Sequence, residues 1–210
     1  MINVEKLGKQ YNQQWLFRDF SFQFQPGNIY GILGPNGSGK STFVKLLLGL
    51  SEATEGKIIY SINENRIQPN QLHKHYSFAA PYSGLLDDLT LKEQINIYTR
   101  FKPLMNGISA DDLLKKTNLS EQRNLKFHFL SSGMKQRLRL ALAILSDTPF
   151  LFLDEPASHL DADSTQWFHK LFHEHALNRT IVIATNQHSD EICLCKEMIN
   201  ITEYKKESPT

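Results

Sequence analysis

Apolar and polar positions along the chain predict strands of two kinds. Near the N-terminus, FSFQFQPGN places Phe20, Phe22 and Phe24 on one face and polar residues on the other, before a Pro26-Gly27 turn. A strand with one apolar face suits an antiparallel layer. Three later runs are almost wholly apolar, as in strands buried on both faces of a parallel sheet. They are IYGIL at 29–33, FLFL at 150–153 and TIVIAT at 180–185.

Helical spacing follows the first of these runs. Phe43, Leu46, Leu47 and Leu50 recur at intervals of three and four residues, directly after a glycine-rich loop. The order strand, loop and helix is therefore expected between residues 29 and 50.

The middle of the chain, about residues 81–145, shows no strand pattern. In LTLKEQINIYTRF, Leu91, Ile95 and Tyr98 share one helical face, and Thr90 with Glu93 three residues later forms a capping box. SADDLLKKTNL and SSGMKQRLRLALAIL also indicate helices. The segment is expected to be a helical insertion.

The glycine-rich loop GPNGSGKST, residues 34–42, fits the pattern G-x-x-x-x-G-K-[ST] of a phosphate-binding loop. Its glycines let backbone N–H groups approach a polyphosphate, and the positive end of the following helix adds to the attraction. Lys40 is suited to the β- and γ-phosphate oxygens and Ser41 to Mg²⁺. The remaining expected contacts come from Asn36, Gly37, Ser38, Gly39 and Thr42.

Two carboxylates follow the apolar run at 150–153. Asp154 and Glu155 would lie at the carboxyl edge of the sheet, where such sheets bind ligands. Asp154 is expected to reach Mg²⁺ through water. Glu155 is expected to polarise a water molecule for in-line attack on the γ-phosphate.

These patterns predict one α/β domain over residues 1–210. A P-loop nucleotide-binding core, about 1–80 and 146–203, carries an N-terminal antiparallel β layer and the inserted α-helical subdomain at 81–145. The tail, 204–210, is expected to fray.

Composition excludes several other functions. Lys and Arg total 23 against 22 Asp and Glu, so no net charge favours a nucleic-acid partner. Cys193 and Cys195 are too close for a useful disulfide loop and too few for a zinc site. The N-terminus lacks a signal-peptide core and no apolar run reaches the ~20 residues that span a bilayer. A transport path would have to belong to another polypeptide.

The motifs and their order resemble the ATP-binding cassette (ABC) family of transporter subunits, from about residue 2 to residue 203. LSSGMKQR at 130–137 is similar to the family signature, and ASHLD at 157–161 is similar to its D-loop. Tyr11 occupies the position of the family's adenine-stacking aromatic. The resemblance implies that two cassettes pair head to tail, so that Ser131, Gly133 and Asp161 help to close the ATP site of a partner, most simply an identical chain.

Two positions depart from the family pattern. The family places a glutamine nine residues before Thr90, and here that position is Pro81, which has no side-chain donor or acceptor. The family's switch histidine is replaced by Asn186, which can donate a hydrogen bond but cannot carry a proton. His188, two residues on, is a weaker substitute because a helix is expected to start there. We expect Asn186 to act with Lys40 and Glu155 in slow ATP hydrolysis.

The resemblance further implies a cytoplasmic protein on the inner face of the cell membrane, bound to an integral-membrane permease and driving export. In the family a groove beside the helical insertion receives the permease. Tyr82, Leu85, Leu86, Tyr98 and Phe101 line such a groove here, or else belong to the core of the insertion. An ATP-binding control module with little hydrolysis is the alternative function.

Overall fold

The computed structural model of the protein describes residues 1–81, 84–176, 178–186 and 188–205. The strands are β1 (Ile2–Tyr11), β2 (Gln14–Phe24), β3 (Ile29–Leu33), β4 (Glu55–Ile62), β5 (Asn65–Arg66), β6 (Tyr76–Ala79), β7 (Phe150–Asp154), β8 (Thr180–Thr185) and β9 (Glu197–Asn200). The α-helices are α1 (Lys40–Leu47), α2 (Leu91–Phe101), α3 (Ala110–Lys116), α4 (Ser132–Leu145), α5 (Ala162–His175) and α6 (Ser189–Ile192). Short 3-10 helices cover Pro69–Lys74, Met105–Gly107, Phe127–Phe129 and Ile201–Tyr204.

The strands form two sheets of different character. β2, β1, β4 and β5 make an antiparallel sheet in that order, and β6, β7, β8, β3 and β9 make a parallel one. The antiparallel sheet contains the alternating N-terminal pattern, and the parallel sheet contains the three apolar runs. The predicted α/β class with an antiparallel layer is confirmed.

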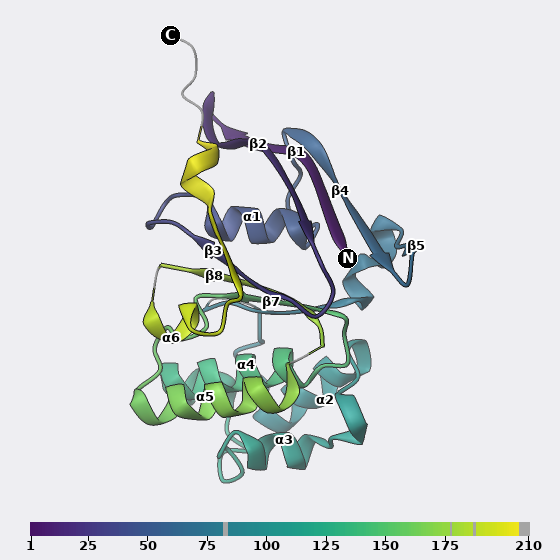
Figure 1. Cartoon of the computed structure of the whole chain (residues 1–210). Helices are drawn as coiled ribbons and strands as arrows, with labels where there is room; N and C mark the ends of the chain where they lie inside the picture. The colour runs from purple at the N-terminus through teal and green to yellow at the C-terminus, as the bar shows by residue number, and fades with distance from the viewer. Residues whose placement is uncertain (82–83, 177, 187, 206–210) are drawn as a thin grey trace.

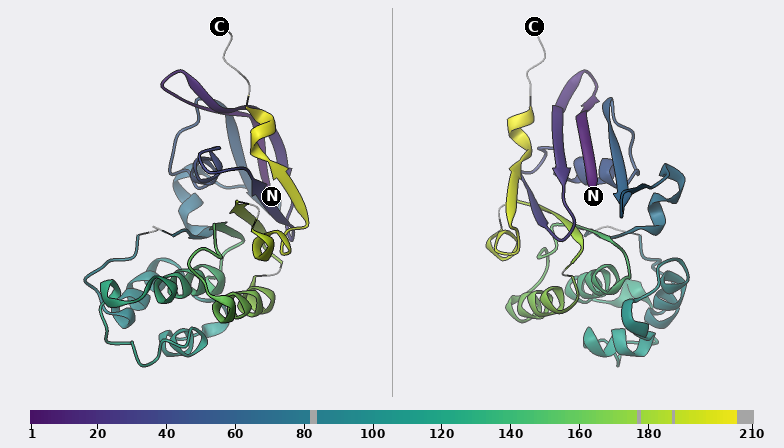
Figure 2. Two further views of the ribbon diagram at one scale, coloured as in Figure 1. Left: turned by 90° about the vertical axis from the view of Figure 1, so that its left-hand side faces the viewer. Right: turned by 45° about the vertical axis from the view of Figure 1, so that its right-hand side comes forward.

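The elements stack in layers, as Figure 1 shows, with the antiparallel sheet above α1, the parallel sheet below α1, and α2 to α5 beneath. In both views of Figure 2 these four helices remain on the same side of the parallel sheet. The parallel strands are therefore covered on both faces, which explains why their sequences are apolar without alternation.

β7 shows how one strand serves two cores. Phe150 and Phe152 pack in the cluster around α1 and the antiparallel sheet. Leu151 and Leu153 pack in the cluster formed with the helices below. Because the strand is anchored on both faces, its last residue, Asp154, is held at a fixed place on the edge of the sheet.

In the described part of the region between β6 and β7 the regular elements are helices, which are joined by turns and loops, with two isolated β-bridges. The capping box predicted at the start of α2 is present, since Thr90 N–H donates to Glu93 Oε2 at 2.9 Å and Glu93 N–H donates to Thr90 Oγ1 at 3.3 Å. Leu91 and Ile95 are fully buried, as their spacing predicts.

The chain departs from the sequence pattern at two element ends. α1 stops at Leu47, and Gly49 takes a left-handed conformation with φ 68°. Leu50 is consequently 62 % exposed and is not part of the apolar helix face that its spacing predicts. The second difference concerns the C-terminal tail, which the sequence predicts to fray from residue 204. Tyr204 lies in the last 3-10 helix, and its ring packs on Phe20 with ring centroids 4.7 Å apart.

Candidate functional site

The glycine-rich loop joins β3 to α1 with the geometry of an anion-binding turn. Gly37 and Gly39 have φ of 79° and 101°, values that residues with a side chain rarely adopt. A Cβ on Gly39 would also lie 3.3 Å from Leu16 Cβ. Gly39 caps α1, so the loop ends at a helix N-terminus whose free N–H groups favour negative charge.

Lys40, the first residue of α1, turns back over the loop. Its Nζ donates hydrogen bonds to the carbonyl oxygens of Gly34 at 2.8 Å and Pro35 at 3.1 Å, and to Asn186 Oδ1. Burial lowers the pKa of Lys40, and the carboxylates of Glu155 and Asp154 act in the opposite direction. A cation is thus held at the centre of the loop beside two acids.

Asp154 lies at the end of β7 and is only 7 % exposed. Burial raises the pKa of Asp154, while a hydrogen bond with Ser41 acts in the opposite direction. Its Oδ1 has no hydrogen-bond partner in the described part of the chain. A buried carboxylate oxygen without a partner beside a serine hydroxyl fits Mg²⁺, which binds one or two such groups and keeps several waters.

Glu155 and Asn186 meet across the carboxyl edge of the sheet. Asn186 Nδ2 donates to Glu155 Oε1 at 2.6 Å, while its Oδ1 accepts from Lys40. Glu155 has a left-handed backbone, φ 47°, and its N–H donates to Ala184 O of β8 at 2.8 Å. The Asn186 amide therefore bridges the lysine of the loop and the acid that follows β7.

A cavity of about 350 Å³ brings most of the predicted contacts together. It is lined by Tyr11, Leu16, Asn36, Gly37, Gly39, Lys40, Ser41, Thr42 and Glu155. Ser38 lines an adjoining cavity of about 170 Å³ with Leu16, Asn36 and Gly37. Tyr11 is 50 % exposed, and Lys9 Nζ lies over its ring, 4.7 Å from the centroid. Leu16 was not predicted, because the pattern of β2 marks it only as a strand residue.

Ser131, Gly133 and Asp161 are not among the described residues that line this cavity. Ser131 caps α4 by accepting from Met134 N–H at 3.2 Å, and Asp161 caps α5 by accepting from Ser164 N–H at 2.8 Å. A Cβ on Gly133 would lie 3.3 Å from His159 O. The signature and the D-loop therefore pack on each other within one chain.

The signature helix is also tied to the segment after Glu155. Gln136 is fully buried, and its Nε2 donates to Pro156 O at 3.0 Å. Sequence reasoning missed this residue, because its place in α4 is polar in pattern and nothing local shows what it contacts.

Two further predictions concern Pro81 and His188. Pro81 follows β6 by two residues and is partly buried. His188 is exposed, caps α6, and its Nδ1 lies 3.4 Å from Asp190 Oδ2. The ring therefore faces its own helix, as expected, and Asn186 takes the position next to Lys40 and Glu155.

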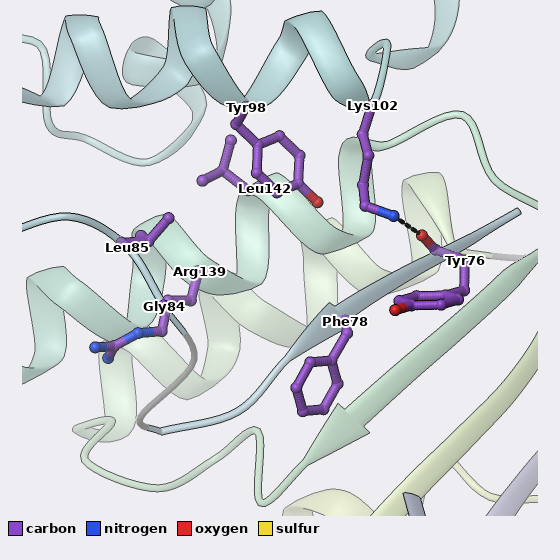
Figure 3. A pocket seen from close by; sticks show the side chains of 8 residues that line it. All are labelled: Tyr76, Phe78, Gly84, Leu85, Tyr98, Lys102, Arg139 and Leu142. Atoms are coloured by element: carbon purple, nitrogen blue, oxygen red, sulfur yellow. Dashed lines mark hydrogen bonds between the residues drawn. The ribbon is translucent and has the colours of Figure 1, made fainter. Parts of the chain in front are cut away.

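A groove of about 190 Å³ lies between β6, α2 and α4 (Figure 3). Its lining residues are Tyr76, Phe78, Gly84, Leu85, Tyr98, Lys102, Arg139 and Leu142. Leu85 and Tyr98 line it as the groove interpretation predicts, whereas Leu86 and Phe101 are exposed and do not line it. Tyr82 lies outside the described residues.

Lys102 closes one end of the groove, with its Nζ 4.4 Å from the centroid of the Tyr76 ring and bonded to the carbonyl oxygens of His73, at 2.7 Å, and Tyr76. Burial lowers the pKa of Lys102 from 10.5 to about 8. Between these values the unfolded chain binds more protons than the folded one, so the free energy of unfolding should rise with pH.

Replacing Lys102 by methionine should remove that part of the rise. Chemical unfolding at several pH values between about 8 and 10.5 measures the free energy of unfolding of both proteins. The difference between wild type and Lys102→Met removes the contribution of the titrating groups that the two proteins share. The exposed Lys92→Met is the matched control and should keep the wild-type slope. Equal slopes for all three proteins would contradict the expectation.

Comparison with known proteins places this geometry in a family. The family model described as ABC transporter matches residues 17–158. An uncharacterised ABC transporter ATP-binding protein of Bacillus subtilis, YybJ, is 32 % identical over 99 % of this chain and 95 % of its own. The cytochrome c biogenesis ATP-binding export protein CcmA of Haemophilus influenzae is 30 % identical over 98 % of this chain and 97 % of its own.

Solved structures agree in fold. An ATP-binding subunit of an ABC transporter superimposes with a TM-score of 0.83 at 25 % identity, covering 96 % of this chain and 85 % of that one. A dimeric bacterial ABC transporter cassette gives 0.80 at 23 % identity, covering 96 % and 94 %. With the phosphate loop, the acidic pair and the signature in place, the chain belongs to the ABC transporter family as one of its ATP-binding subunits.

Proposed function

We propose that the chain is the ATP-hydrolysing subunit of an export transporter, and that it drives a separate membrane permease by closing and opening a dimer. The observation that supports this most is the arrangement of Lys40, Asn186 and Glu155 beside the phosphate loop. It unites a phosphate-binding cation with an acid suited to activate water.

ATP binding begins with the cavity described above. Tyr11 stacks on the adenine, and the N–H groups from Asn36 to Thr42 hold the phosphates. Lys40 exchanges its bonds to carbonyl oxygens and Asn186 for bonds to phosphate oxygens. Ser41 and Asp154 would hold Mg²⁺, directly or through water, and the ion would neutralise charge on the phosphates.

Hydrolysis then depends on Glu155 and Asn186. Glu155 accepts a proton from the attacking water, and Asn186 orients Glu155 and donates a hydrogen bond to the γ-phosphate. Because an amide cannot carry a proton as the family histidine can, turnover is slow compared with relatives that keep histidine.

A second cassette completes the site. Ser131, Gly133 and Asp161 lie away from the cavity of their own chain, so they reach phosphate only in another copy. The helix end capped by Ser131 supplies N–H groups to the partner's nucleotide by the same physics as the phosphate loop. An identical chain supplies the partner in the simplest assembly.

The groove between β6, α2 and α4 receives the permease. Its aromatic and aliphatic walls suit an amphipathic segment, and Arg139 and Lys102 add positive charge. None of the helices in the described part of the chain has both the length and the apolar character that crossing a bilayer requires. The chain would act on the cytoplasmic face of the membrane, without nucleic acid. Export is favoured by the names of relatives such as CcmA and a Nod factor export protein of Burkholderia pseudomallei.

An ATP-binding control module of a membrane complex is the second candidate function. Pro81 and Asn186 favour it, since both replace family residues that serve hydrolysis or coupling. The intact pair of Asp154 and Glu155 favours the ATPase, because a module that only binds ATP has no need of Glu155.

Photo-crosslinking from the groove tests the permease partner. A photoreactive residue at Leu85, introduced in cells that express the chain naturally, should give an adduct with an integral-membrane protein. The same residue at Leu50, exposed at the end of α1, is the matched control and should not. Adducts with the same membrane protein from both positions, or only with non-membrane proteins from Leu85, would contradict docking in the groove.

A further inference from the structure

A buried carboxylate lies behind the site and has no part in the mechanism above. Glu191, in α6, is 2 % exposed. Burial raises the pKa of Glu191, and hydrogen bonds from Thr185 and from the backbone of Ala157 act in the opposite direction. Lys40, His188 and Glu155 also interact electrostatically with Glu191.

The Glu191 carboxylate connects segments far apart in the chain. Its Oε1 accepts from Ala157 N–H at 2.8 Å, and the Thr185 hydroxyl donates to the same carboxylate. Thr185 Oγ1 also accepts from His188 N–H at 3.2 Å, and Glu191 N–H donates to His188 O at 3.0 Å. The start of the D-loop, the end of β8 and α6 are thus held together by one side chain.

The positions of these contacts matter for the site. Ala157 follows Glu155 by two residues, and Thr185 directly precedes Asn186. Glu155 and Asn186 themselves are joined by a hydrogen bond of 2.6 Å. Glu191 therefore bridges the two backbone segments just behind the two side chains that face each other in front.

We propose that Glu191 is a positioning residue, which sets the spacing between Glu155 and Asn186 and thereby the contact of both with the γ-phosphate. This rests on the proposed function, because it assigns Glu155 and Asn186 to that phosphate. Glu191 touches no nucleotide itself. A shift of about 1 Å at a reacting group can cost on the order of 10²-fold in rate, so a support at this place is important for turnover.

Two substitutions at Glu191 separate the effect of its bridging hydrogen bonds from the effect of its negative charge. In Glu191→Gln, the amide oxygen can accept from Ala157 N–H and the amide nitrogen can donate to Thr185 Oγ1, so the bridge remains without its charge. In Glu191→Ala both bonds are lost. We expect Glu191→Ala to lower kcat by about 10- to 100-fold with little change in KM, and Glu191→Gln to recover most of that loss. The exposed Glu197→Ala is the matched control and should turn over as wild type does.

A second measurement needs no hydrolysis. In the Glu155→Gln background, the ratio of the dissociation constants for ADP and ATP reports contact with the γ-phosphate. Glu191→Ala should reduce this ratio and leave the affinity for ADP nearly unchanged, and Glu191→Gln should keep it. If Glu191→Ala does not fold, the near-isosteric Thr185→Val removes the Thr185 bond to Glu191, together with the bond from His188 N–H, and keeps the bond from Ala157 N–H, so it should lower the ratio less strongly.

The outcomes distinguish this inference from the proposed function. If the wild type turns over ATP, two results would overturn the positioning role. One is a kcat of Glu191→Ala equal to that of the wild type, and the other is an equal loss of kcat in Glu191→Ala and Glu191→Gln. Absence of wild-type turnover would contradict the ATPase alone, and the affinity ratio would then decide the role of Glu191. An unchanged ratio in Glu191→Ala would overturn it there as well.

Discussion

Replacing Glu155 by glutamine should lower steady-state ATP turnover by about 10³-fold, while ATP binding persists. Glutamine keeps the oxygen that accepts from Asn186 Nδ2, so the hydrogen bond observed at 2.6 Å can remain. What it loses is the basicity needed to take a proton from water. Phosphate release under saturating ATP and Mg²⁺ measures the loss, and nucleotide titration measures the binding.

The same variant should accumulate as an ATP-bound dimer, because the step that opens the dimer is blocked. The exposed Glu174→Gln in α5 is the matched control and should behave as wild type. Turnover of Glu155→Gln within tenfold of wild type would show that another group activates the water.

Replacing Asn186 by histidine should raise turnover by about 10- to 100-fold. Asn186 already lies between Lys40 and Glu155, so a ring at this position would face the γ-phosphate. An imidazole can donate a hydrogen bond there and can also take and release a proton near neutral pH, which an amide cannot. Single-turnover kinetics of phosphate release give the rate of the chemical step.

His188→Ala serves as the control for this substitution, because the His188 ring faces Asp190 at 3.4 Å. It should leave the rate as it is. An unchanged rate in Asn186→His would mean that Asn186 already performs the role of the family histidine, and the expectation of slow hydrolysis would lose its physical basis.

Local patterns predicted those parts of the fold that depend on neighbours in sequence. The alternation of Phe20, Phe22 and Phe24 gave an antiparallel strand, and Thr90 with Glu93 gave a helix start. The prediction for Leu50 was wrong because α1 ends before it, where Gly49 takes a left-handed conformation. The spacing of apolar residues alone does not show where a helix ends.

Contacts across the chain were not predictable in the same way. Lys40 and Asn186 are 146 positions apart, and Ala157 and Glu191 are 34 apart. Local patterns place Lys40 at the start of a helix and Asn186 after a strand, but the pairing of these two residues depends on the order of β7, β8 and β3 in the sheet. Glu191 was missed for this reason, as was Gln136, since each acts through one buried hydrogen bond to a distant backbone group.

The substitutions at Pro81 and Asn186 have different structural consequences. Asn186 keeps a polar group between Lys40 and Glu155, so under the proposed function hydrolysis would lose the proton-carrying group but keep the geometry. Proline at 81 has no side-chain polar group for a relay to the groove. Gln136 offers a different physical connection, because α4 lines the groove through Arg139 and Leu142 and is bonded through Gln136 to Pro156, next to Glu155.

We propose above all that this chain hydrolyses ATP and that each ATP site needs a second chain. Steady-state ATPase activity of the purified protein over a wide range of protein concentration tests both parts at once. We expect Mg²⁺-dependent turnover whose rate per chain rises with protein concentration and then levels off as dimers form. Tight ATP binding with no Mg²⁺-dependent turnover at any concentration, or turnover by a particle that stays monomeric in ATP, would contradict it.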